Sequence, residues 1–292
     1  MAHDLPYDLL ISPDQLMTVT ASQAPVLVFD CTFDLSHTAA GHAKYLESHI
    51  AGAVYADLDK ALSDKQGTGV SGGRHPLPSR EKFAEWLSSV GLANDMQAVV
   101  YDRNGANYCG RLWWMLKWVG HTNVALLDGG LQAWQAAGGK TTAGSETPNS
   151  PSKYVLAKAM SSLVATKTVA DNLGRPIQTL IDARGAPRFR GEVEPLDPIA
   201  GHIPGALNRP FTQNFGADGK FKPAVELKTE FEALLAGRDP ATVVLHCGSG
   251  VSAVPNIIAM QIAGLGDSST LGLYAGSWSD WCSDASRPMA QG

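Results

Sequence analysis

The feature that most constrains the fold of this chain is an internal duplication, because three short segments recur in the same order about 150 residues further on. The matched pairs are 26–30 with 179–182, 49–53 with 202–206, and 127–134 with 274–281. The middle pair shares the pattern His-Ile-x-Gly-Ala. Since three ordered matches are hard to obtain by chance, we infer a tandem duplication of one domain.

Each half alternates short apolar runs with stretches at helical spacing. The apolar runs are 26–29, 98–101, 179–181 and 242–245, and the helical patterns include 80–90 and 227–236. This rhythm is typical of an α/β fold, with a mostly parallel sheet flanked by helices. A length of 292 residues also agrees with two domains of about 150 residues each.

The boundary between the halves is predicted from composition. Residues 141–158 are rich in Thr, Ser, Gly and Pro and show no periodicity, which is typical of a linker. We therefore expect a first domain over residues 1–145, a linker over 146–158 and a second domain over 159–292.

One segment of the second half, His246–Ala253, points to covalent chemistry. It directly follows the apolar run 242–245 and precedes an apolar stretch at helical spacing. Cys247 is thus expected at a strand end, in a small-residue turn that faces a helix N-terminus. Converging backbone N–H groups and the positive end of the helix dipole favour an anion there, so we predict a nucleophilic thiolate.

The equivalent position in the first half carries no cysteine. After the run 98–100, Tyr101 and Asp102 stand where His246 and Cys247 stand in the second half. An aspartate cannot store or transfer sulfur, so we predict one active site per chain, in the second domain.

The other three cysteines, at 31, 109 and 282, lie outside glycine-rich loops and are expected to pack in the core. The sequence has no Cys-x-x-Cys pair and no clustered histidines, which argues against a metal site and a disulfide framework.

Charge and the N-terminal sequence limit the partners. The net charge of −5, with dispersed acidic residues, gives no basic surface for nucleic acid. Residues 1–25 contain three aspartates and no continuous apolar core, so we expect neither a signal peptide nor a membrane anchor. Small molecules or other proteins are the expected partners, and the cytoplasm is the expected location.

Taken together, these residues resemble the two-domain rhodanese-like sulfurtransferases over nearly the whole chain. The resemblance rests on the loop Cys-Gly-Ser-Gly-Val-Ser-Ala, on both His-Ile-x-Gly-Ala segments, on Asp182-Ala183-Arg184 with Arg188-Phe189, and on Gly276-Ser277-Trp278. The loop is most similar to that of the 3-mercaptopyruvate sulfurtransferases. Thiosulfate enzymes of the family usually carry basic residues directly after the cysteine, whereas Gly248 and Ser249 are neutral.

The resemblance implies a two-step reaction without metal or cofactor. Thiolate Cys247 attacks the sulfur of 3-mercaptopyruvate, which releases pyruvate as its enolate and leaves a persulfide, with its sulfane sulfur, on the enzyme. A thiol or cyanide acceptor then removes the outer sulfur, and a thioredoxin-like reductant is a candidate protein partner. The loop residues expected to hold the sulfur anion and the substrate are Gly248, Gly250, Val251 and Ser252.

The resemblance also assigns roles outside the loop. Arg188 is the expected partner of the donor carboxylate, because a guanidinium fork matches carboxylate geometry. A proton relay is expected from Ser249, Asp59 and His75. Asp57 lies two residues from Asp59 and is an alternative to it, and His75 is alternatively a solvated loop residue.

Several recurring residues are expected to support the fold. His49 and His202 occur in both halves, including the half without the cysteine. Asp182 has its counterpart in Asp30, and a large aromatic residue such as Trp278 after a glycine turn is more often part of the core.

Two departures from the family pattern leave the donor open. Family members that use mercaptopyruvate generally have a second arginine in a Glu-Pro-Arg setting, but residues 194–197 read Glu-Pro-Leu-Asp. The second arginine is then absent or comes from elsewhere, with Arg190 and Arg209 as candidates. In addition, Ala275 stands where the family usually has an aspartate.

Three rival functions remain at this point. A cysteine phosphatase needs an arginine six residues after the cysteine, where this chain has Ala253, so phosphoryl transfer is disfavoured. A thiosulfate:cyanide sulfurtransferase is the nearer alternative. The third is a carrier module in which Cys247 holds a persulfide for a protein acceptor without turnover of small molecules.

Overall fold

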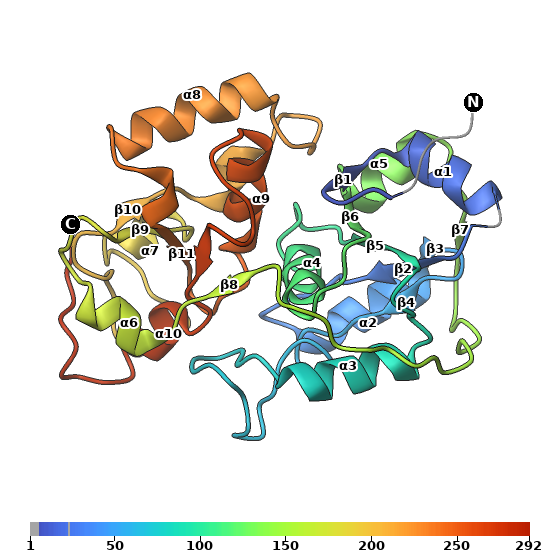
Figure 1. Ribbon diagram of the computed structural model, residues 1–292, viewed down its shortest axis with the longest axis horizontal. Coiled ribbons are helices and arrows are strands. Elements are labelled where there is room, and N and C mark those ends of the chain that lie inside the picture. The colour runs from blue at the N-terminus through green and yellow to red at the C-terminus, as the bar shows by residue number, and fades with distance from the viewer. Residues whose placement is uncertain (1–5, 23) are drawn as a thin grey trace. The chain divides into compact units, whose positions relative to one another are not determined.

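The computed structural model describes residues 6–22 and 24–292, and the chain divides into two compact units (Figure 1). The first unit comprises the described residues of Met1–Ser63, Pro78–Met160 and Phe215–Phe221. The second comprises Asp64–Leu77, Ser161–Asn214 and Lys222–Gly292. Each unit therefore includes one short segment from the other half of the sequence.

The first unit is built on a parallel sheet with the strand order β1-β6-β5-β2-β4. Its elements are β1 (Leu10–Ile11), α1 (Pro13–Ala21), β2 (Val26–Asp30), α2 (Thr38–Glu47), β3 (His49–Ile50), β4 (Val54–Tyr55), α3 (Arg80–Ser89), β5 (Gln97–Tyr101), α4 (Cys109–Trp118), β6 (Val124–Leu127), α5 (Gly130–Ala136) and β7 (Thr141–Thr142). Strands β3 and β7 form a separate antiparallel pair.

The second unit is built on a parallel sheet with the strand order β10-β9-β11-β12-β8. Its elements are β8 (Ser162–Leu163), α6 (Thr166–Asp171), β9 (Thr179–Asp182), α7 (Ala186–Phe189), β10 (Leu207–Asn208), the 3-10 turn η1 (Phe211–Asn214), α8 (Ala224–Leu235), the 3-10 turn η2 (Pro240–Thr242), β11 (Val243–His246), α9 (Val254–Ile262), β12 (Gly272–Leu273) and α10 (Ser277–Trp281).

The two sheets share one topology. When the strands are taken in chain order, β8, β9, β10, β11 and β12 occupy the places of β1, β2, β4, β5 and β6. Helices flank the strands of each unit (Figure 1). The prediction of two α/β domains, each with a mostly parallel sheet flanked by helices, is thus confirmed.

The central strands and the helices that follow them carry the core of each unit. All residues of β5 and β11 are buried, as expected for parallel strands covered on both faces. Every residue of α4 is buried, and α9 buries seven of its nine residues. These elements are the rigid support for the loops that leave the carboxyl ends of β5 and β11.

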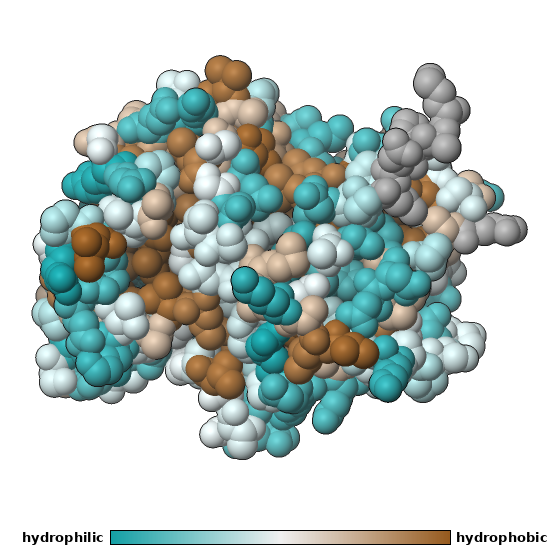
Figure 2. All heavy atoms as spheres, viewed as in Figure 1, coloured by the Kyte–Doolittle hydropathy of each residue, from teal (hydrophilic) through white to brown (hydrophobic). Residues whose placement is uncertain are grey.

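Most of the large apolar side chains that remain exposed come from separate segments, and Val225 is the most exposed at 79%. Three of them, Val193, Leu196 and Ile199, lie in one short segment. On the face drawn in Figure 2, apolar residues form small groups among hydrophilic ones. Among the described residues, no helix has the length and apolar character needed to span a membrane. The expectation for residues 1–25 falls in part on residues 1–5 and 23, which lie outside the described part.

Candidate active site

Cys247 lies where the strand order of the second sheet reverses. From β9 the chain continues outward to β10 and then returns to β11 on the other side of β9. In open α/β sheets this reversal leaves a crevice at the carboxyl ends of the strands, where ligands bind. Cys247 directly follows β11, and its loop leads into α9. The residue is buried, with 1% of its surface exposed.

The first turn of α10 holds the start of the cysteine loop. The Cys247 N–H donates to the Ser277 hydroxyl over 3.0 Å. The Trp278 N–H donates to the Cys247 carbonyl over 3.0 Å, and the Ser279 N–H donates to the Gly248 carbonyl over 2.9 Å. These three bonds fix three successive peptide groups, from 246–247 to 248–249.

Two of the three predicted relay residues are in direct contact. The Nδ1 atom of His75 lies 2.8 Å from the Ser249 hydroxyl oxygen, and both side chains are buried. His75 comes from the segment Asp64–Leu77, which belongs to the second unit. Asp59 belongs to the first unit, where its N–H donates to Asp57 Oδ1, so its part in the relay stays a prediction.

A close backbone approach brings the neighbour of His75 to the loop as well. Gly73 has φ +84°, and a Cβ at this position would lie 2.5 Å from the Gly276 carbonyl oxygen. The next residue, Arg74, donates its N–H to the Ser279 hydroxyl over 3.0 Å. Only glycine fits this position without moving the backbone, so the sequence Gly-Gly-Arg-His serves to seat Arg74 and His75 against α10.

Arg74 and Arg188 converge beside Gly248. A Cβ at Gly248 would lie 3.0 Å from Arg74 Nη2 and 3.6 Å from Arg188 Nη1. Within the described part of the chain, neither nitrogen donates a hydrogen bond. Both side chains remain accessible, because Arg74 is 28% and Arg188 20% exposed. Two guanidinium groups thus present free N–H donors next to the residue that follows Cys247.

Two carboxylates hold these guanidinium groups in place. Asp197 bridges them, since it accepts from Arg74 Nη1 and, over 3.2 Å, from Arg188 Nη2. Glu194 accepts from the Arg188 Nη2 and Nε atoms over 2.6 and 3.2 Å. Burial raises the pKa of Asp197, although the neighbouring Arg74 acts in the opposite direction.

The structure places Arg74 beside Arg188 and Gly248, and it gives other partners to the two candidates named from the sequence. Arg190 pairs with Glu192 at the surface. Arg209 is buried, pairs with Glu230 and lies over the Phe231 ring. Arg74 was missed because it is far from Arg188 in the sequence. The available signal was its place between Gly72-Gly73 and His75.

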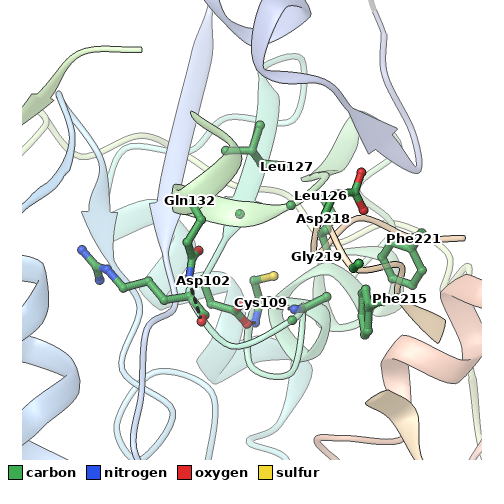
Figure 3. Close-up of a pocket in the computed structure, with 15 residues that line it drawn as sticks. Asp102, Cys109, Leu126, Leu127, Gln132, Phe215, Asp218, Gly219 and Phe221 are labelled. Carbon is green, nitrogen blue, oxygen red and sulfur yellow. Dashed lines mark hydrogen bonds between the residues drawn. The ribbon is translucent and has the colours of Figure 1, made fainter. Parts of the chain in front are cut away.

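In the equivalent loop of the first unit, backbone N–H groups surround the carboxylate of one of the loop's own residues, Asp102. The Asp102 carboxylate accepts four backbone N–H groups, from residues 104 and 106 at Oδ1 and from 108 and 109 at Oδ2, over 2.8 to 3.2 Å. Burial raises the pKa of Asp102, while the Cys109 N–H favours the charged form. Figure 3 shows Asp102 and Cys109 at a cavity of about 360 Å³, with the Phe215 and Phe221 rings at one side.

The cysteine loop has backbone donors of the same kind. In the described residues, no acceptor is found for the N–H groups of Gly248, Ser249, Val251, Ser252 and Ala253. In the first unit, Asp102 takes up such donors itself. An anion attached to Cys247 would find the corresponding donors in the second unit.

Ala275 and its counterpart in the first unit, Asp128, make different contacts. The Asp128 carboxylate accepts from the Phe221 N–H over 3.0 Å and so anchors the segment Phe215–Phe221 in the first unit. Ala275 is fully buried, and its backbone lies close to the cysteine loop, since a Cβ at Gly250 would lie 2.3 Å from the Ala275 carbonyl oxygen.

The recurring histidines and the Asp182–Arg184 ion pair at the end of β9 make contacts that support the fold. His49 Nδ1 contacts the Tyr45 carbonyl and His202 Nδ1 the Phe189 carbonyl, over 2.7 and 2.8 Å. Arg184 pairs with Asp182 over 2.7 Å and lies over the Trp278 ring. Trp278 itself is fully buried.

All four cysteines are unpaired and buried. Burial raises the pKa of the Cys31 and Cys109 thiols well above the usual value, and the Asp102 carboxylate adds to the effect. Among the described residues, no group of His, Cys, Asp and Glu side chains has the arrangement of a metal site.

Comparison with known proteins shows what this chain is similar to. The model of the rhodanese-like domain matches residues 12–137 and 165–284. A probable 3-mercaptopyruvate sulfurtransferase of Pseudomonas aeruginosa is 45% identical over 279 residues, which cover 95% of this chain and 96% of that protein. A putative thiosulfate sulfurtransferase of Mycobacterium tuberculosis is 38% identical, with 97% of both chains covered.

A solved structure agrees with these relatives. The 3-mercaptopyruvate sulfurtransferase from Leishmania major superimposes with a TM-score of 0.79 at 30% identity. The match covers 97% of this chain and 76% of that one.

Proposed function

Because this chain belongs to the rhodanese-like sulfurtransferases and is an enzyme that transfers sulfur, we propose that it takes sulfur from 3-mercaptopyruvate through a persulfide on Cys247. The observation that carries the proposal is the convergence of Arg74 and Arg188 beside Gly248. It supplies a site for a carboxylate directly next to the nucleophile. The relative at 45% identity, named for this substrate, supports the same donor.

In this proposal the donor binds through its carboxylate. The free Nη1 of Arg188 and Nη2 of Arg74 donate to the two carboxylate oxygens, since guanidinium groups match the planar geometry of that group. Asp197 and Glu194 keep both side chains in place before the donor arrives. The thiol carbon of the donor then lies toward Cys247.

The first step moves one sulfur atom. The Cys247 thiolate forms a bond to the donor sulfur, and the bond between that sulfur and the donor carbon breaks. The electron pair leaves with the carbon as the enolate of pyruvate, which takes up the proton of the donor thiol to give pyruvate. We assign the hydrogen-bonded pair of Ser249 and His75 to the donor carbonyl and to this proton.

The second step regenerates the thiolate. The backbone N–H groups after Cys247 hold the persulfide anion, as the corresponding groups hold the Asp102 carboxylate in the first unit. Cyanide attacks the outer sulfur and leaves as thiocyanate, whereas a thiol leaves as a persulfide. A thioredoxin-like dithiol would instead release sulfide and form its own disulfide. A cytoplasmic location agrees with four unpaired cysteines.

Initial rates with two donors test the proposal. With cyanide as acceptor, we expect 3-mercaptopyruvate to give a higher kcat/KM than thiosulfate, and Cys247→Ser to be inactive with both. The relative at 38% identity, named for thiosulfate, makes that donor the second candidate. Faster turnover of thiosulfate would overturn the choice of donor, and an active Cys247→Ser enzyme would overturn the persulfide route.

A further inference from the structure

Ser277 is a buried residue with a left-handed backbone next to the cysteine loop. Its φ is +56°, a conformation that is strained for a residue with a side chain and not for glycine. Only two other residues that are not glycine have a positive φ in the described chain, Ala106 and Ala236. A strained position that is retained in a buried wall of the site needs an explanation.

The first unit shows what the fold alone requires at this place. Gly130 begins α5 as Ser277 begins α10, and its φ is +59°. The Leu131 N–H donates to the Asp102 carbonyl as the Trp278 N–H donates to the Cys247 carbonyl. The left-handed turn is therefore common to both units, and glycine satisfies it without strain. The side chain of the serine is present only in the unit that carries the cysteine.

The hydroxyl of Ser277 has one function in the structure. It accepts from the Cys247 N–H over 3.0 Å and donates to the Tyr274 carbonyl over 2.9 Å. Ser277 is fully buried, so water does not replace either bond. The hydroxyl thus links the peptide group of the nucleophile to the end of β12.

We propose that Ser277 is a positioning residue for Cys247. The Ser277 hydroxyl fixes the backbone of the nucleophile, at the cost of a strained turn. The inference rests on the proposed function only for its kinetic consequence. The bonds from Trp278 and Ser279 hold the loop in place in either case, so loss of the hydroxyl frees only the N–H of Cys247. Sulfur transfer then slows, while donor binding at Arg74 and Arg188 stays intact.

Two substitutions at Ser277 separate the effect of the hydroxyl from the effect of the strained backbone. Ser277→Ala removes the hydroxyl and keeps the strained Cβ, whereas Ser277→Gly removes both. We expect both variants to lose about fivefold to tenfold in kcat with KM changed less than twofold. The glycine variant should melt about 2–4 °C above the alanine variant, because the strain is relieved. Ala236→Gly, at an exposed helix end with φ +49°, relieves similar strain away from the site and should keep full activity.

Hydrogen exchange at the Cys247 amide is measured on the same proteins, and both Ser277 variants should exchange faster than the wild type at this position. The inference is overturned if kcat stays within twofold of the wild type in both variants, or if exchange at Cys247 is unchanged. It is also overturned if the loss of kcat in the two variants tracks their melting temperatures and not the shared loss of the hydroxyl. A wild-type enzyme that transfers no sulfur from either donor contradicts the proposed function instead. In that case amide exchange at Cys247 alone decides whether Ser277 fixes the backbone of Cys247.

Discussion

Arg74→Ala removes one of the two guanidinium groups beside Gly248. A charge-assisted hydrogen bond contributes about 1.5–3 kcal/mol when it is buried. Since the Arg74 side chain is 28% exposed, solvent screening places its contribution at the lower end, about 1.5 kcal/mol. We therefore expect kcat/KM for 3-mercaptopyruvate to fall roughly tenfold, mainly through a higher KM.

Loss of Arg74 has a second consequence that is measured separately. Asp197, whose side chain is only 3% exposed and bridges both arginines, is left with Arg188 as its partner there and draws that group away from the donor. The double variant Arg74→Ala/Asp197→Asn removes this carboxylate as well, so it should recover part of the lost kcat/KM. Arg190→Ala removes an arginine that pairs with Glu192 at the surface and serves as the matched control.

Steady-state rates over a range of donor concentrations, with cyanide as acceptor, give KM and kcat for each protein. An Arg74→Ala enzyme with kcat/KM within twofold of wild type would refute the carboxylate site. So would a loss of the same size in Arg190→Ala, because the effect would then be one of general charge.

Three further predictions concern the segments around the site and the stability of the first unit. Gly73→Ala places a Cβ 2.5 Å from the Gly276 carbonyl oxygen and should abolish most activity. The control is Gly205→Ala, at a position with a similar φ and no neighbour within 4 Å, which should lower only stability. Equal activity losses in the two variants would contradict this prediction. Asp102→Ala leaves four backbone N–H groups without an acceptor, so the free energy of unfolding in urea should fall by about 2–4 kcal/mol with kcat unchanged. A fall of less than about 0.5 kcal/mol would contradict this reasoning. Burial lowers the pKa of His121 to about 4 from its usual 6.5, so the unfolded chain binds a proton that the folded chain does not, and up to about 3 kcal/mol of stability is lost as the pH falls through that window. His121→Gln should lose less stability than wild type between pH 7 and 4.5, and identical losses would show that His121 is not responsible.

The sheets and the nucleophile were predictable because their signals are local. A buried parallel strand gives a continuous apolar run, and the glycines after β11 mark the turn at its carboxyl end. The duplication added the contrast between Cys247 and Asp102, and the structure shows a loop amide network around the aspartate.

Arg74 and Ser277 could not be assigned from the sequence, because their roles depend on contacts between distant segments. Arg74 reaches Gly248 only because the segment Asp64–Leu77 packs in the second unit, against α10. The function of Ser277 depends on a backbone angle that the residue type does not indicate. The sequence does contain the contrast between Ser277 and Gly130, but its meaning requires the hydrogen bond to Cys247.

The mass of the enzyme after exposure to 3-mercaptopyruvate, without acceptor, tests the central claim most directly. We predict that the wild-type chain gains one sulfur atom, that the peptide containing Cys247 carries it, and that cyanide removes it as thiocyanate. Cys247→Ser should gain none under the same conditions. Sulfur on any other cysteine, or turnover of the donor without a sulfur-carrying enzyme, would contradict a persulfide on Cys247.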